Sequence, residues 1–192
     1  MSREERRVLV LEGSPRIGNT SLVTDWVLAG LGQKGIEVTR IRVAERLIGG
    51  CQECLGCTGT KRQAQCQQDD DMLEIYDLMV DSDLVIFTSP VFCWGVTSQL
   101  KAVVDRCFAL LHGENLLKGT KWAVVVTAGG DHFDGADLIV QMFSRLAHFA
   151  KVEFLGQHVV ANCPDRPALK RNRQIQAAAR AFGRELRRAL LG

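Results

Sequence analysis

Strand-like and helix-like patterns of hydrophobic residues alternate along this chain. Short unbroken apolar runs are typical of buried parallel strands, and apolar residues spaced three and four apart are typical of amphipathic helices. The expected strands are residues 8–11, 35–43, 84–88, 122–127 and 152–160. The expected helices are residues 22–31, 70–80, 100–111, 138–149 and 169–191. This alternation predicts an α/β fold in which helices cover both faces of a mostly parallel sheet.

The second expected strand, residues 35–43, is polar on one side and is therefore expected at the sheet edge. Ligands of such sheets bind beyond the carboxyl ends of the strands. The turns after the first, third and fourth strands are thus expected to form one site, at residues 13–21, 89–97 and 128–135. No repeat or linker interrupts the pattern, so we interpret residues 1–192 as one domain with a cysteine-rich loop at about 49–70.

Composition argues against a membrane protein. With 192 residues and 46% hydrophobic content, the chain can form one full core. Its charged start is followed by an apolar run that is too short for a signal peptide, and no stretch reaches the roughly 20 apolar residues of a membrane span. We therefore expect a cytoplasmic protein without a membrane partner.

The net charge of +2 hides an asymmetry. From Arg166 onward the chain has eight basic residues and one acidic residue, Glu185. Arginines share one side of the last expected helix and apolar residues share the other, which is typical of a solvated helix face. No interleaved aromatic residues or recognition motif support nucleic-acid binding, so we expect no nucleic-acid partner.

The turn at residues 13–21 is predicted to bind one phosphate. A strand, a glycine- and hydroxyl-rich turn and a helix leave backbone N–H groups facing one spot. A nucleotide triphosphatase loop would have lysine where Asn19 stands, and Ser14 and Pro15 break the dinucleotide fingerprint. The expected phosphate ligands are Ser14, Arg16, Gly18, Asn19, Thr20 and Ser21. The alternative is a plain turn in which Asn19 or Thr20 caps the helix.

Two further turns suit a planar ring. Residues 89–97 contain a Phe-Cys-Trp run between proline and glycine, whose flat surfaces could stack on a heterocycle. The alternative is that Phe92 and Trp94 fill the local core. After the fourth strand, small residues from Thr127 to Gly130 allow close approach of backbone N–H groups. A phosphate turn, a ring platform and a glycine turn together describe a site for flavin mononucleotide (FMN).

Three segments carry a resemblance to a known family. Residues 13–21, residues 89–95, and Leu100 and Lys101 with Asp105 and Arg106 resemble the flavodoxin-like NAD(P)H-dependent FMN reductase superfamily over roughly the first 130 residues. The resemblance implies a three-layer flavodoxin-like sandwich with a five-stranded parallel sheet of order 2-1-3-4-5. It also implies that the first turn binds the FMN phosphate. The residues that it places around the flavin ring are Pro90, Val91, Phe92, Cys93, Trp94 and Gly95 on one side, and Thr127, Ala128, Gly129 and Gly130 on the other.

The implied activity is an FMN-dependent oxidoreductase. It would accept hydride from NAD(P)H and pass electrons to a small-molecule acceptor such as a flavin or a quinone. Because the flavin carries the chemistry, no catalytic acid or base is assigned to the protein. The resemblance also implies a homodimer or homotetramer. An alternative of another class is a flavin-binding regulatory module without turnover.

Four cysteines lie close together in the loop at about residues 49–70. Thiolates are the usual ligands of iron–sulfur clusters. Cys51, Cys54, Cys57 and Cys66, followed by residues 69–72, resemble the iron–sulfur flavoproteins of the same superfamily. In that subgroup a [4Fe–4S] cluster exchanges electrons with FMN, and ferredoxin reduces the protein. Eight residues separate Cys57 from Cys66. Free thiols, structural zinc and a redox-active Cys54 or Cys57 are the alternatives.

Two expectations concern other polar and sulfur-containing side chains. Cys93, Cys107 and Cys163 are interpreted as ordinary buried thiols. Lys101, Asp105 and Arg106 lie together on one expected helix, so we expect an ion pair within that helix.

Overall fold

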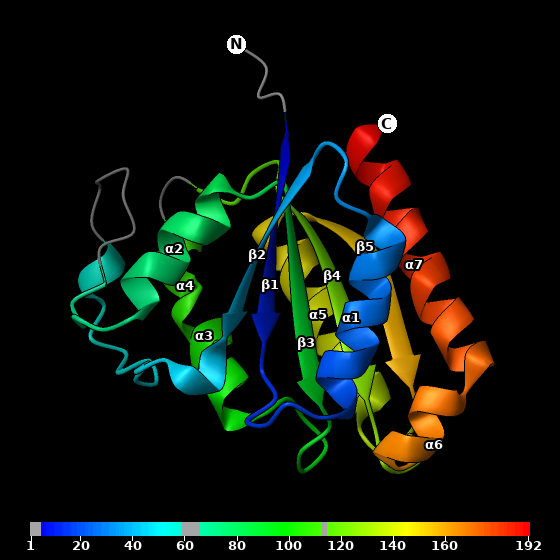
Figure 1. Ribbon diagram of the computed structural model, residues 1–192. Coiled ribbons are helices and arrows are strands. Elements are labelled where there is room, and N and C mark those ends of the chain that lie inside the picture. The colour runs from blue at the N-terminus through cyan, green and yellow to red at the C-terminus, as the bar shows by residue number, and fades with distance from the viewer. Residues whose placement is uncertain (1–4, 59–65, 113–114) are drawn as a thin grey trace.

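A five-stranded parallel sheet lies at the centre of the computed structural model, which describes residues 5–58, 66–112 and 115–192 (Figure 1). Its strands are β1 (Arg6–Glu12), β2 (Ile36–Arg42), β3 (Leu84–Pro90), β4 (Lys121–Thr127) and β5 (Glu153–Val160). Neighbouring strands pair in parallel in the order β2-β1-β3-β4-β5. The α/β class, the edge position of the second strand and the strand order implied by the resemblance are confirmed.

Helices cover both faces of this sheet. They are α1 (Asn19–Leu31), α2 (Met72–Asp81), α3 (Ser98–Arg106), α4 (Phe108–Leu111), α5 (Ala136–Ala150), α6 (Arg166–Arg171) and α7 (Arg173–Leu191), with short 3-10 turns η1 (Val43–Glu45) and η2 (Gly56–Thr58). Because successive strand side chains point to opposite faces, Val8 and Val10 enter one core and Leu9 and Leu11 enter the other. The first core packs against α1 and α7, and the second against α2 to α5. The result is a three-layer sandwich.

Two expected helices are interrupted in the structure. The helix expected over residues 169–191 is divided into α6 and α7, because the Asn172 side chain accepts the N–H groups of Gln174 and Ile175 and begins a new helix. The helix expected over residues 100–111 is divided into α3 and α4 at Cys107. None of the described helices is long and apolar enough to cross a membrane.

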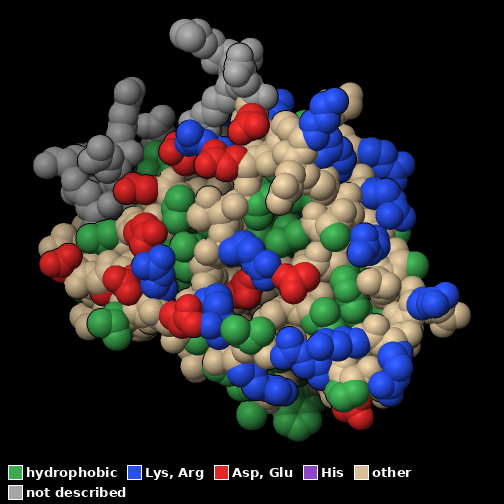
Figure 2. Space-filling model, in the orientation of Figure 1, with side chains coloured by type: hydrophobic (Ala, Val, Ile, Leu, Met, Phe, Trp, Pro, Cys, Tyr) green, Lys and Arg blue, Asp and Glu red, His purple; other side chains and the backbone are tan. Residues whose placement is uncertain are grey.

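Charged side chains are distributed unevenly over the surface. Figure 2 shows Lys and Arg side chains along the right-hand side, where α7 lies in Figure 1, and many Asp and Glu side chains on the opposite side. Arg180, Arg184 and Arg188 are exposed on α7, while Phe182, Leu186 and Leu190 are buried beneath it. The amphipathic pattern of this helix is confirmed.

Helices α1 and α7 approach each other closely through two glycines. A Cβ atom on Gly183 would lie 2.0 Å from the Val27 carbonyl oxygen, and one on Gly30 would lie 2.1 Å from the Arg180 carbonyl oxygen. Real Cβ atoms do not occupy such positions, so both sites require glycine. This close contact fixes α1, which begins at the predicted phosphate turn, against the last helix of the chain.

We predict that Gly183→Ala destabilises the protein by about 1–3 kcal/mol, the usual cost of overpacking, although alanine is the better helix former. Urea denaturation measures this change. Arg184→Ala, at the neighbouring exposed position, is the control and should change stability by less than about 0.5 kcal/mol. Equal stability of both variants would show that the two helices can separate without cost.

Candidate functional site

The turns after β1, β3 and β4 meet at the carboxyl edge of the sheet, where the arrowheads lie in Figure 1. They surround one cavity of about 220 Å³, which residues from all three turns line. The three turns therefore lie together at this edge, where the sequence pattern places them.

Five of the six predicted phosphate ligands line this cavity: Ser14, Arg16, Gly18, Asn19 and Thr20. Ser21 is buried and does not line it. Helix α1 follows Gly18, and no side chain of the described residues caps its first turn. The alternative in which Asn19 or Thr20 caps the helix is therefore wrong. The N–H groups of the first turn have no partners within the helix, which is the arrangement that favours an anion.

Several side chains of this turn are already hydrogen bonded. The Ser14 hydroxyl donates to the Arg16 carbonyl oxygen over 2.8 Å, and the Thr20 and Thr127 hydroxyls lie 2.7 Å apart. The Asn19 amide nitrogen donates to the Pro164 carbonyl oxygen over 2.7 Å. These bonds hold the turn in shape. They leave the helix N-terminus and the exposed Arg16 guanidinium as its main groups for an anion.

The same turn is fastened to the start of α3. The Gly13 N–H donates to the Thr88 carbonyl oxygen over 2.8 Å, and the Thr97 hydroxyl donates to the Gly13 carbonyl oxygen over 2.6 Å. A Cβ atom on Gly13 would lie 2.8 Å from the Leu100 Cβ. Only glycine therefore allows the turn after β1 to approach α3 this closely.

The turn after β3 forms a tight hairpin at the mouth of the cavity. Phe92 and Gly95 exchange two backbone hydrogen bonds of 2.9 Å. Between them, Cys93 and Trp94 have φ angles of +46° and +61°, in the left-handed region that residues other than glycine rarely adopt. Phe92 is 49% exposed and Trp94 63% exposed, so the alternative that they fill the local core is wrong. Cys93 is also exposed, which corrects the expectation of a buried thiol.

The predicted ring-binding residues therefore divide into two groups. Pro90, Val91 and Phe92 line the cavity, whereas Cys93, Trp94 and Gly95 lie outside its lining. On the other wall, Thr127, Ala128 and Gly129 line the cavity, whereas Gly130 does not.

Sequence reasoning missed two lining residues, Pro15 and Cys163. Cys163 follows β5, and its N–H donates to the Ala128 carbonyl oxygen over 2.8 Å, which brings it to the cavity wall. Half-burial raises the pKa of its thiol, although the bond from Asn19 opposes this shift. The carboxyl end of β5 shares the sheet edge with the other turns, and this signal could have identified the residue.

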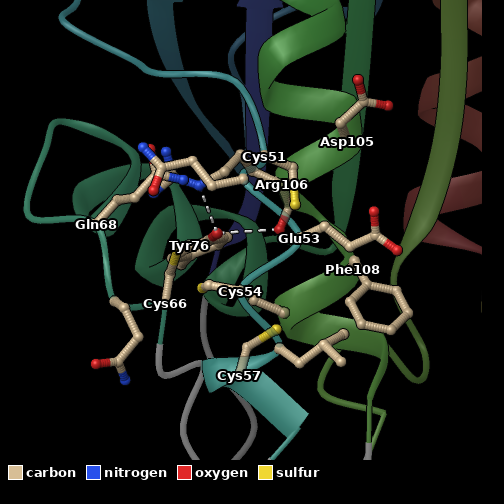
Figure 3. Close-up of a pocket in the computed structure, with 14 residues that line it drawn as sticks. Cys51, Glu53, Cys54, Cys57, Cys66, Gln68, Tyr76, Asp105, Arg106 and Phe108 are labelled. Carbon is tan, nitrogen blue, oxygen red and sulfur yellow. Dashed lines mark hydrogen bonds between the residues drawn. The ribbon is translucent and has the colours of Figure 1, made fainter.

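A second cavity, of about 410 Å³, lies beside the described parts of the cysteine loop, residues 49–58 and 66–70. Cys51, Cys54, Cys57 and Cys66 all line it, together with Tyr76, Arg106 and Phe108 (Figure 3). Three of these cysteines come from the segment after η1 and the fourth precedes α2. Burial raises the pKa of the Cys57 thiol. The loop thus collects four thiols around one space.

Arg106 forms a buried ion pair at the edge of this cavity, in addition to the ion pair within α3, which is confirmed. The intrahelical pair joins Lys101 to Asp105, at 2.6 Å, whereas Arg106 binds Asp70 through two hydrogen bonds of 2.8 and 3.0 Å. Partial burial by itself would raise the pKa of Asp70, but hydrogen bonds from Arg106 and from the N–H groups of Gly49 and Met72 lower it below its ordinary value.

The thiols fit an iron–sulfur group in kind but not yet in arrangement. Four cysteine sulfurs are the ligand set that such clusters use. In the ranges that the structure describes, however, no three His, Cys, Asp or Glu side chains are placed to hold a metal ion. Ligation would require the thiols to move together within the loop.

The strained hairpin generates a prediction. Trp94→Gly should stabilise the protein by about 1 kcal/mol, because glycine tolerates the positive φ angle that tryptophan adopts at a cost. Trp94→Phe keeps the strain and should leave stability unchanged. Thermal and urea denaturation measure both variants. A loss of stability in Trp94→Gly would mean that indole contacts outweigh the strain.

Comparison with known proteins agrees with this architecture. A model of the NADPH-dependent FMN reductase family matches residues 6–165. An iron–sulfur flavoprotein of Archaeoglobus fulgidus is 33% identical over 134 residues, which are 70% of this chain and 67% of the relative. Another, of Methanosarcina thermophila, is 28% identical over 79% of this chain and 78% of the relative.

Solved structures show the same fold. The NAD(P)H:quinone oxidoreductase of Methanothermobacter marburgensis superposes with a TM-score of 0.71 at 16% identity, over 95% of this chain and 96% of that one. A flavone reductase superposes with a TM-score of 0.69 at 19% identity, over 96% of this chain and 63% of that one. At such identities the likeness concerns the fold alone. The family match, in contrast, covers most of the sequence, and the chain therefore belongs to the NADPH-dependent FMN reductase family, with iron–sulfur flavoproteins among its relatives.

Proposed function

We propose that this protein binds FMN in the cavity between the turns after β1, β3 and β4 and transfers hydride from NAD(P)H to a flavin, a quinone or a similar acceptor. The observation that carries the proposal is the convergence of an uncapped helix N-terminus, an aromatic hairpin and a small-residue turn on one cavity. Membership of the FMN reductase family supports it.

The phosphate of FMN would bind at the start of α1. The N–H groups of its first turn supply hydrogen bonds and the positive end of the helix dipole. The Arg16 side chain folds back toward the start of the helix, since its guanidinium carbon lies 3.6 Å from the position that a Cβ atom on Gly18 would occupy. Its positive charge would therefore lie close to the phosphate. Arg16 has no ion-pair partner among the described residues, which leaves it free for a phosphate.

The flavin ring would lie between the other two turns. Pro90, Val91 and Phe92 offer one wall, and Thr127, Ala128 and Gly129 offer the other. At Gly129 a Cβ atom would meet no other atom within 4 Å, so its backbone is open to the cavity. When bound, FMN supplies hydride acceptance and electron transfer. No carboxylate or histidine of the described residues lines the cavity, so the protein's part is to bind and orient.

A second candidate function is that of an electron carrier with FMN and a [4Fe–4S] cluster, reduced by ferredoxin. The four cysteines that line one cavity favour it, as does the similarity to iron–sulfur flavoproteins. Cys51, Cys54, Cys57 and Cys66 would hold the cluster. Iron content and the identity of the reductant distinguish this function from the first.

Two further features of the protein also remain proposals. We expect a homodimer or homotetramer, and the exposed Phe92, Trp94 and Phe133 would suit burial against a second copy. A cytoplasmic location is expected from the sequence.

The function is tested by reconstitution and turnover. Protein purified without oxygen should bind FMN and should oxidise NADPH or NADH only when a quinone or free flavin is present, as followed by absorbance. FMN binding without turnover, together with about four irons per chain and reduction by ferredoxin, would favour the electron carrier. Failure to bind FMN would contradict both proposals.

The phosphate site is tested by charge reversal. Arg16→Glu should weaken FMN binding about 10- to 100-fold, because a hydrogen bond to a charged group contributes about 1.5–3 kcal/mol. Riboflavin, which lacks the phosphate, should bind the variant nearly as well as the native protein. Arg180→Glu, at an exposed position on α7, is the control and should not change FMN binding. Equal losses for both flavins, measured by fluorescence titration, would exclude a phosphate role for Arg16.

A further inference from the structure

The two ends of the cysteine loop are joined at a short neck. The Leu47 N–H donates to the Asp71 carboxylate over 2.7 Å, and the Asp71 N–H donates to the Leu47 carbonyl oxygen over 3.1 Å. One step further into the loop, the Gly49 N–H donates to the Asp70 carboxylate over 2.9 Å. Hydrogen bonds therefore join the segment that precedes the four cysteines to the segment that follows them.

Arg106 binds both sides of this neck at once. Its guanidinium donates to both carboxylate oxygens of Asp70, to the Gly49 carbonyl oxygen over 3.0 Å, and to the Tyr76 hydroxyl over 3.4 Å. The Tyr76 hydroxyl in turn donates to the Arg106 carbonyl oxygen over 3.0 Å. Figure 3 shows Arg106 and Tyr76 among the four cysteines of the loop. A planar guanidinium can make these bonds together, whereas a lysine could not.

The burial of Arg106 argues against a role in stability alone. The residue is 2% exposed, and removing a charge from water carries a large cost. Buried ion pairs often contribute less to stability than apolar residues of similar volume. What an apolar side chain could not do is bind the backbone at Gly49 and the carboxylate of Asp70, the two points between which all four cysteines lie.

We propose that Arg106 is the positioning residue of the cysteine loop, which holds Gly49 and Asp70 together so that the four thiols share one cavity and can ligate an iron–sulfur group. The inference rests on the second proposed function for the identity of that group. Arg106 would not touch the cluster's iron. It acts through Asp70 and Gly49, by limiting the conformations of the loop that must rearrange on ligation.

The position of Arg106 also relates the loop to the FMN cavity. Helix α3 begins beside Thr97, which is hydrogen bonded to the turn after β1, and ends at Arg106. Its nine residues span about 13 Å. One helix therefore connects the predicted flavin site with the cysteine cavity. The contacts of Arg106 with Asp70 and Gly49, at the end of this helix, hold the loop in place relative to the flavin site.

The test uses the full chain and removes both charges of the Arg106–Asp70 ion pair. The double variant Arg106→Met with Asp70→Asn avoids an unpaired buried charge and should fold. After anaerobic reconstitution with iron and sulfide, we expect it to retain less than half of the iron of the native protein. Hydrogen exchange of the amides at residues 47–58 and 66–71 should be at least tenfold faster. FMN affinity and the melting temperature of the flavin-loaded protein should change little.

Two controls separate positioning from general destabilisation. Lys101→Met removes an exposed ion pair from the same helix and should leave iron content and loop exchange unchanged. Arg106→Lys keeps the charge without the bidentate contacts, and should lose iron nearly as severely as the double variant. Native iron content in the double variant, or a parallel loss of iron, FMN affinity and melting temperature, would overturn the proposal.

The outcome also separates the positioning role proposed for Arg106 from the proposed iron–sulfur function. If the native protein takes up no iron, the iron–sulfur function fails, and loop exchange alone decides whether Arg106 orders the loop. If the native protein and the double variant take up iron equally, the iron–sulfur function is supported and the positioning role of Arg106 is wrong.

Discussion

The divergence of the chain after β1 and β3 is the constraint on which the candidate site depends. These strands are neighbours, yet α1 packs on one face of the sheet and α3 on the other. Their turns must therefore separate, and a crevice opens between them. Gly13 keeps that crevice narrow, because its contact with Leu100 leaves no room for a side chain. A parallel sheet with this strand order consequently produces the cavity before any particular ligand is considered.

Most of this architecture could be predicted from the hydrophobic pattern, because the pattern is local. A few neighbouring residues are enough to identify a continuous apolar strand or a glycine-rich turn. All five strands accordingly lie close to their expected ranges. Element boundaries were less predictable where one polar side chain decided them. Asn172 ends one helix and begins another through its own amide oxygen, which the apolar spacing of the surrounding residues does not show.

The candidate site was predictable in its turns and less so in its side chains. Asn19 lines the cavity, but its amide also donates to the carbonyl oxygen of Pro164, a residue distant in the sequence. The ion pair expected within α3 forms between Lys101 and Asp105, but the contacts of Arg106 with Asp70 and Gly49 were not predicted. Cys163 reaches the cavity because its turn pairs with that after β4. In each case the deciding contact joins segments far apart in the chain, so no local spacing could reveal it.

The two cavities are built on different physical principles. The predicted flavin cavity depends largely on backbone: a helix N-terminus, a glycine contact and hydrogen bonds between turns. Backbone N–H and C=O groups can make these contacts with many different side chains around them. The neck of the cysteine loop depends instead on the side chains of Arg106 and Asp70. A change at either residue could abolish the second site while leaving the first intact, so a single fold can supply both a plain flavin reductase and a flavoprotein with an additional redox group.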